Sequence, residues 1–126
     1  MKIELDSELS TSNKIISYSN GSFRLKDSLL KRNIVISKNC LIENWIVESY
    51  HNLATRHLDQ IISWQPELII IGSGSVPSFP NGELIEHTAS KNIGLEIMDT
   101  GAACRSYNLL IDEGRDVVAC LFLSDN

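Results

Sequence analysis

The chain has 126 residues, of which 43% are apolar, enough to form one hydrophobic core and typical of a single globular domain. Its formal net charge is -5 and its basic residues are scattered, which excludes a nucleic-acid partner held by electrostatic attraction. No apolar run is long enough to span a bilayer, so we expect one domain over residues 1–126, with residues 1–12 loosely ordered.

The first third of the chain is predicted to form antiparallel strands. Their expected ranges are residues 15–18, 22–25, 33–36 and 43–47. Asn20 and Gly21 lie between the first two runs and predict a two-residue hairpin turn with positive φ at Gly21. Apolar and polar residues alternate in this region, as in strands with one solvated face.

From Asn52 onward the apolar residues recur at helical spacing. Asn52 is expected to cap the first helix, and Pro66 to end it. Residues 67–71 are predicted to form a strand, whose apolar run from Leu68 to Ile71 is typical of burial on both faces of a parallel sheet. A second helix is predicted over residues 82–91. Its expected inward residues are Leu84, Ile85, Thr88 and Ala89.

The remaining elements are a strand at residues 94–98, a helix at residues 102–113 that Gly114 ends, and a strand at residues 116–123. The inward stripe of the helix is expected to consist of Ala103, Tyr107, Leu110 and Ile111. Alternation of helices and strands predicts an α/β fold. We expect a single three-layer domain, whose mixed sheet has a parallel βαβ half and an N-terminal antiparallel hairpin layer.

Two polar turns follow the strands expected to be parallel, so both are predicted to open side by side at the carboxyl edge of the sheet. Gly72, Ser73 and Gly74 form the first, which lacks the third glycine of a dinucleotide fingerprint. It is either a tight turn leaving a strand or part of a ligand site. Asp99 and Thr100 form the second, which is either a helix N-cap or, with the following amides, a site for a small anion.

Arg105 and Asn108 are predicted to lie on the outer face of the last helix, as solvated residues or as contacts to a ligand or partner. Cys104 lies beside the inward stripe and is expected to be a small buried hydrophobe, although a thiolate near a helix N-terminus would be a nucleophile. His57 is expected to be packed and hydrogen-bonded. No spacing of histidines, cysteines or carboxylates indicates a metal site or a catalytic constellation. We therefore predict no cofactor.

Two stretches resemble the hallmarks of a small domain family of unknown function. They are residues 96–110 with the following 113–115 (EIMDTGAACRSYNLL, then EGR) and residues 68–74 (LIIIGSG). The family is the Mth-like one that includes the mitochondrial NADH dehydrogenase (complex I) assembly factor 3 and the adipogenesis-associated Mth-like domain protein. The similarity covers about residues 15–122. It implies a three-layer α/β fold and no established catalytic activity.

The resemblance and the absence of a catalytic constellation favour a non-catalytic protein-interaction or assembly-factor-like domain, with respiratory-complex assembly as the partner class by analogy. The alternative is a small-molecule or anion-binding protein, or an enzyme, that uses the two turns. The three cysteines show no CxxC spacing, and the acidic start lacks the features of a signal peptide. We therefore expect a reduced, cytoplasmic protein.

Overall fold

The computed structural model describes residues 13–19 and 21–123. The strands are β1 (Ser17–Ser19), β2 (Ser22–Arg24), β3 (Leu29–Leu30), β4 (Ile34–Ser37), β5 (Leu41–Ile42), β6 (Leu68–Gly72), β7 (Gly94–Met98) and β8 (Val117–Leu121). The helices are the 3-10 turn η1 (Tyr50–Asn52) and the α-helices α2 (Thr55–Ile62), α3 (Gly82–Ala89) and α4 (Thr100–Asp112). Residues 1–12, for which the sequence predicts loose order, lie outside the described residues.

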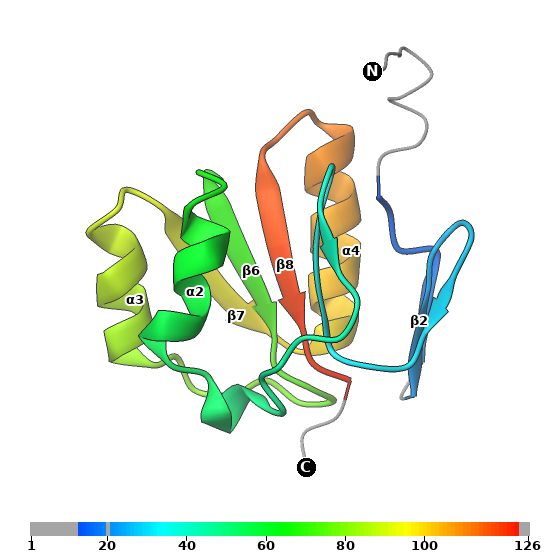
Figure 1. Cartoon of the computed structure of the whole chain (residues 1–126), viewed down its shortest axis with the longest axis horizontal. Coiled ribbons are helices and arrows are strands. Elements are labelled where there is room, and N and C mark those ends of the chain that lie inside the picture. The colour runs from blue at the N-terminus through cyan, green and yellow to red at the C-terminus, as the bar shows by residue number, and fades with distance from the viewer. Residues whose placement is uncertain (1–12, 20, 124–126) are drawn as a thin grey trace.

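The central sheet has five strands in the order β5-β4-β8-β6-β7. Strand β6 pairs in parallel with both β7 and β8, whereas β4 runs antiparallel to β8 and β5. Strands β1, β2 and β3 form a separate antiparallel sheet. The predicted α/β fold, with a parallel half and an antiparallel hairpin layer, is confirmed (Figure 1).

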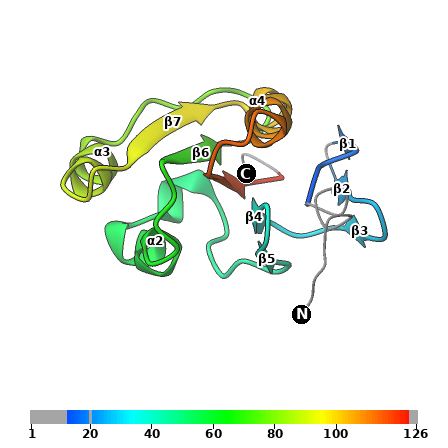
Figure 2. The same cartoon turned by 90° about the horizontal axis from the view of Figure 1, so that it is seen from above.

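Different elements cover the two faces of the central sheet, so the domain has the three layers that the sequence predicts. Helix α4 and the small sheet lie on one face, while α2 and α3 lie on the other (Figure 2). Strand β6 serves both faces, because Ile70 packs in the cluster beneath α4, whereas Ile69 and Ile71 pack in the cluster beneath α2 and α3. All three isoleucines are fully buried, which explains why this strand has no polar residue.

The predicted hairpin is confirmed, because Ser19 pairs with Ser22 and leaves a two-residue turn between β1 and β2. Asn20 lies outside the described residues, so the positive φ at Gly21 stays a prediction.

The strand predicted at residues 43–47 was wrong. Trp45 and Val47 are buried while Asn44 and Ile46 are exposed, so the alternation that suggested a strand is present. However, the Trp45 amide donates to the backbone oxygen of Asn33, and the Asn33 side chain donates to the backbone oxygen of Val47. The segment is therefore held by the Asn33 side chain and one backbone hydrogen bond instead of a strand partner.

Two details of the helices also differ from the predictions. Asn52 does not cap α2, because it belongs to η1, and α2 begins only after Ala54, whose amide donates to the ring nitrogen Nδ1 of His57. Ile85 and Ala89 are exposed on α3, because this helix lies near the sheet edge over β7 and beside α2 and buries only a narrow stripe. No helix among the described residues is long and apolar enough to cross a bilayer.

Candidate functional site

The two polar turns lie side by side at the carboxyl edge of β6 and β7, as the parallel topology requires. Gly72 is in register with Met98 at the ends of the two strands. Beyond them, the Thr100 amide donates to the backbone oxygen of Gly74 at 2.8 Å, and the Gly74 amide donates to Oγ1 of Thr100 at 2.9 Å. The turns are thus joined directly to each other.

These turns are buried, and their polar groups satisfy one another. Thr100 has no exposed surface, and Ser73 is only 2% exposed. The Thr100 hydroxyl donates to the backbone oxygen of Phe122 at 2.6 Å, which links the turns to the end of β8. A side chain at Gly72 would place its Cβ only 2.9 Å from Cα of Thr100, so a glycine is needed for this close approach. The arrangement is a closed structural seam that offers few free donors to a ligand.

Asp99 is the N-cap of α4. Its Oδ1 accepts from the Ala102 amide at 2.9 Å, and its backbone is extended, as a cap requires. One of the amides that an anion would need is therefore already occupied by the protein's own carboxylate.

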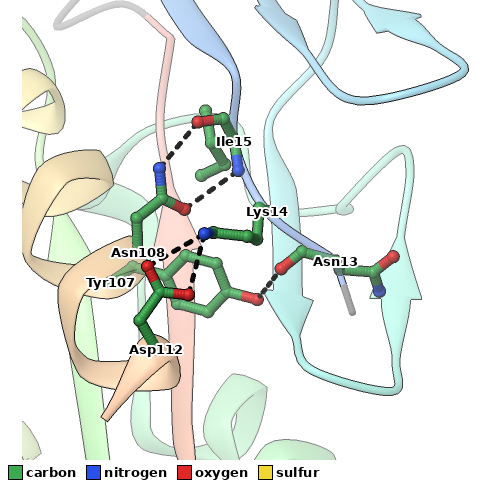
Figure 3. A network of polar contacts seen from close by, with 6 residues as sticks. All are labelled: Asn13, Lys14, Ile15, Tyr107, Asn108 and Asp112. Atoms are coloured by element: carbon green, nitrogen blue, oxygen red, sulfur yellow. Dashed lines mark hydrogen bonds and ion pairs between the residues drawn. The ribbon is translucent and has the colours of Figure 1, made fainter. Parts of the chain in front are cut away.

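Arg105 and Asn108 have different roles on α4. Arg105 is exposed, and no residue in the described part of the chain forms an ion pair or hydrogen bond with its guanidinium group. Asn108 is half-buried and forms two bonds with the backbone of Ile15: its Oδ1 accepts from the amide at 3.0 Å, and its Nδ2 donates to the oxygen at 2.7 Å (Figure 3). Asn108 is thus a structural clamp, and the interpretation as a solvated residue was wrong.

A cavity of about 180 Å³ lies between α4 and the first described segment. Its lining residues are Ile15, Ile16, Ser17, Tyr18, Gly101, Cys104, Arg105 and Asn108. Cys104 itself is only 5% exposed, and burial raises the pKa of its thiol to about 12, against a smaller lowering effect of Arg105. The thiol is therefore protonated at neutral pH, which agrees with the predicted buried hydrophobe.

Sequence reasoning missed a larger cavity, of about 530 Å³, at the same edge of the sheet. Its lining residues are Lys31, Arg32, Asn33, Asn44, Trp45, Ile46, Glu48 and Leu123. Strand β4 runs antiparallel to β8, with Ile34 opposite Leu121, so the residues just before β4 lie at the carboxyl edge of β8. Two features of this cavity were present in the sequence: the adjacent basic residues Lys31 and Arg32, and the apolar–polar alternation of residues 43–47. Only the fold shows that these two features lie together.

Large apolar side chains are exposed at this edge. Phe79 is 93% exposed, Ile46 is 82% exposed and Val76 is 56% exposed. The loop that follows β6 bears Phe79 and Val76. The hydroxyl of Tyr50 donates to the backbone oxygen of Phe79 at 2.9 Å, so the loop is tied to η1.

The histidines have structural contacts. His57 accepts from the Ala54 amide, as predicted for a hydrogen-bonded residue, and His87 pairs with Asp59 at 3.0 Å between Nε2 and Oδ1. Within the described ranges, no group of three or more His, Cys, Asp or Glu residues could hold a metal ion.

Comparison with known proteins places the chain in a family. The family model described as "Protein of unknown function (DUF498/DUF598)" matches residues 15–122. The "13 kDa major membrane protein" of Francisella tularensis is 29% identical over 107 residues, which cover 84% of this chain and 86% of that protein. The NADH dehydrogenase 1 alpha subcomplex assembly factor 3 of Danio rerio is 24% identical over 119 residues, covering 93% of this chain and 68% of that protein.

A protein of known structure has the same fold. The solution structure of a Bordetella pertussis protein described as an Mth938-like domain superposes with a TM-score of 0.78 at 23% identity, covering 100% of this chain and 94% of that one. The match of the family model over most of the chain agrees with the resemblance seen in the two stretches. The chain therefore belongs to the DUF498/DUF598 family of unknown function, the Mth-like domain family that includes complex I assembly factor 3.

Proposed function

We propose that this chain is a non-catalytic, assembly-factor-like domain that binds a partner protein through the loops at the carboxyl edge of its sheet. The observation that supports this most is Phe79, whose side chain is 93% exposed. Burial of a large aromatic side chain against a partner is favourable, and aromatic residues are common at the centres of protein interfaces.

The loop that bears Phe79 is restrained before any partner binds. Pro77 and Pro80 limit its backbone, and the Tyr50 hydroxyl holds the oxygen of Phe79. A restrained loop loses less conformational entropy on binding, so more of the contact energy contributes to affinity. Ile46 and Val76 add exposed apolar surface at the same edge of the sheet.

Chemistry at the two turns has less support. The donors and acceptors of Gly74 and Thr100 are paired within the protein, and burial keeps the thiol of Cys104 protonated. These features favour a binding role over a catalytic one.

The names of relatives suggest the class of partner. One is called an assembly factor for a subcomplex of NADH dehydrogenase, and by analogy we propose a subunit or an assembly intermediate of a respiratory complex as the partner. Another is called a major membrane protein. Cytoplasmic location stays our proposal, and fractionation of the native cell tests it, because recovery of the chain in the membrane pellet would contradict it.

Substitution of Phe79 tests the proposed function. Phe79→Ala should leave the free energy of unfolding nearly unchanged, within about 0.5 kcal/mol, because the side chain makes little contact in the folded chain. It should release the partner that the unmodified protein captures from its native cell. Leu109→Ala is the matched control, because Leu109 is also apolar and 60% exposed but lies on α4. Equal partner retention by both variants would contradict the proposal.

Small-anion binding is a second candidate, which rests on Arg105. Its guanidinium group has no partner in the described residues and lies at the rim of the 180 Å³ cavity. Inorganic phosphate should then raise the melting temperature of the protein but not that of Arg105→Ala. A shift of the same size in both proteins would remove Arg105 from the candidate site.

A further inference from the structure

The cavity of about 530 Å³ has a basic side and an apolar side. Lys31 and Arg32 are exposed, and within residues 13–19 and 21–123 neither forms an ion pair. The side-chain amide of Asn44 likewise has no hydrogen bond to any described residue. Ile46 presents an 82% exposed apolar side chain. Glu48 adds one carboxylate to the lining, so the cavity keeps a net positive charge.

The walls of the cavity are fixed by Asn33. Its Nδ2 donates to the backbone oxygens of Val47 and Glu48, both at 3.0 Å, and its Oδ1 accepts from the Leu123 amide at 2.9 Å. The Trp45 ring packs on Phe122, with 5.4 Å between the ring centroids. The cavity is therefore formed before a ligand binds, which reduces the cost of binding.

The cavity and the loop that bears Phe79 lie at the same edge of the sheet, because Lys31 and Arg32 precede β4 beside the end of β8, and the loop follows the neighbouring strand β6. Glu48 lines the cavity, and two residues later Tyr50 donates its hydroxyl hydrogen bond to the Phe79 oxygen. A partner bound at this edge of the sheet therefore meets both the loop and the cavity.

We infer that this cavity receives an acidic segment of the partner protein, and this inference rests on the proposed function. Carboxylates of the segment pair with Lys31 and Arg32, while a neighbouring apolar side chain packs on Ile46. The Asn44 amide donates to a carboxylate or backbone oxygen of the segment. Such pairs determine which partner is accepted more than they add affinity.

An anionic membrane or a nucleic acid fits these observations less well. Either one extends beyond the cavity and would meet the net charge of -5 over the rest of the chain. Two cations also supply few of the contacts that a phosphate backbone or a lipid surface needs. A short acidic segment fits within the cavity, so it contacts Lys31 and Arg32 and avoids the negative charge on the rest of the chain.

Selection from a random peptide library displayed on phage tests the inference with the whole chain as bait. The selected peptides should contain Asp or Glu next to an apolar residue, and their affinity should fall as salt concentration rises. The double variant Lys31→Glu with Arg32→Glu should weaken their binding about tenfold or more. Lys26→Glu is the control, since Lys26 is another exposed basic residue but lines a different cavity, and this variant should keep their binding.

The outcomes separate this inference from the proposed function. If Phe79→Ala abolishes peptide binding but the double charge reversal does not, the proposed function is supported, and the inference that the cavity receives an acidic segment is wrong. Selection of basic or neutral peptides, or of no peptide, would also overturn the inference. The inference is also overturned if the double charge reversal abolishes sedimentation with phosphatidylserine vesicles while peptide binding persists. Lys31 and Arg32 would then bind a membrane.

Discussion

At the scale of single residues, Thr100 shows how a side chain with the appearance of a binding residue can serve the fold. Its hydroxyl bridges the Gly74 amide and the Phe122 oxygen in a fully buried position. It therefore joins the ends of β6 and β8 to the start of α4. A buried hydroxyl with both bonds made is a strong constraint on the chain around it, because neither partner has access to water.

Replacing Thr100 tests this role. Thr100→Val keeps the shape but leaves a buried donor and a buried acceptor unpaired, so the free energy of unfolding should fall by about 2–4 kcal/mol. Thr100→Ser keeps the hydroxyl and loses one methyl group, so the loss should be about 1 kcal/mol. Urea unfolding of both variants measures the difference. Similar losses would mean that the methyl group, and not the hydroxyl, holds the seam.

Cys104 is predicted to react slowly with a thiol reagent in the folded protein at neutral pH. Its side chain is buried, and the raised pKa of its thiol leaves almost no thiolate. Cys40 is the internal control, because it is only partly buried and should be labelled first. Peptide mass mapping after timed labelling distinguishes the two. Labelling of Cys104 as fast as Cys40 would restore it as a candidate nucleophile.

At the scale of elements, α4 holds the first described segment of the chain. Besides the two bonds from Asn108 to Ile15, the Tyr107 hydroxyl donates to the Asn13 oxygen at 2.7 Å, and Lys14 forms an ion pair with Asp112 at 2.7 Å (Figure 3). Side chains of this helix thus bind backbone groups of Asn13 and Ile15, while the amides of Asn13 and Ile16 donate to the backbone oxygens of Lys38 and Arg24. The segment leads directly into β1, so α4 also positions the small sheet.

Asn108→Ala should loosen this segment before it affects the rest of the fold. The loss of two partly buried hydrogen bonds should reduce the free energy of unfolding by about 1–3 kcal/mol. Hydrogen exchange at the Ile15 amide should become much faster, while the amides of β6 stay protected. The exposed Lys14–Asp112 pair is expected to contribute little, so Asp112→Ala serves as the control. Unchanged exchange at Ile15 in Asn108→Ala would contradict the clamp.

At the scale of the whole molecule, burial of two thiols and one phenol sets the response to alkaline pH. Burial raises the pKa values of Cys104, Cys120 and Tyr107 in the folded chain. The unfolded chain releases these protons at lower pH than the folded chain does. Above the ordinary thiol pKa the folded state therefore binds more protons, and stability falls as pH rises.

The free energy of unfolding should accordingly decrease from about pH 9, the ordinary thiol value, and for Cys104 continue to fall toward pH 12. Urea unfolding at several alkaline pH values measures the slope. The double variant Cys104→Ala with Cys120→Ala should lose stability through its cavities, but its slope should be shallower, since only the tyrosine contribution remains. An unchanged slope would show that the pKa values of the two thiols are the same in the folded and unfolded chains.

Local patterns in the sequence determined the fold class and the helices and strands of its parallel half, but not the short strands β3 and β5. Residues 68–71 are apolar at every position because both faces of β6 are covered, and an Asp at position 99 before small residues caps α4 wherever the helix is placed. The order of helices and strands then predicted a parallel half and the meeting of two turns at one edge. These features depend on neighbours in sequence or on general rules of chain connection.

Only the tertiary structure decided what those turns do and where the exposed surface lies. Thr100 bonds to Phe122, 22 positions away in the sequence, so no local pattern could show that Thr100 is buried. Asn33 bonds to Leu123, 90 positions away, so no local pattern could show that Asn33 fixes a cavity wall. Burial and hydrogen bonding depend on which distant residues come together. The sequence could therefore name the polar residues of the sheet edge, but it could not separate those that satisfy one another from those that remain open to a partner.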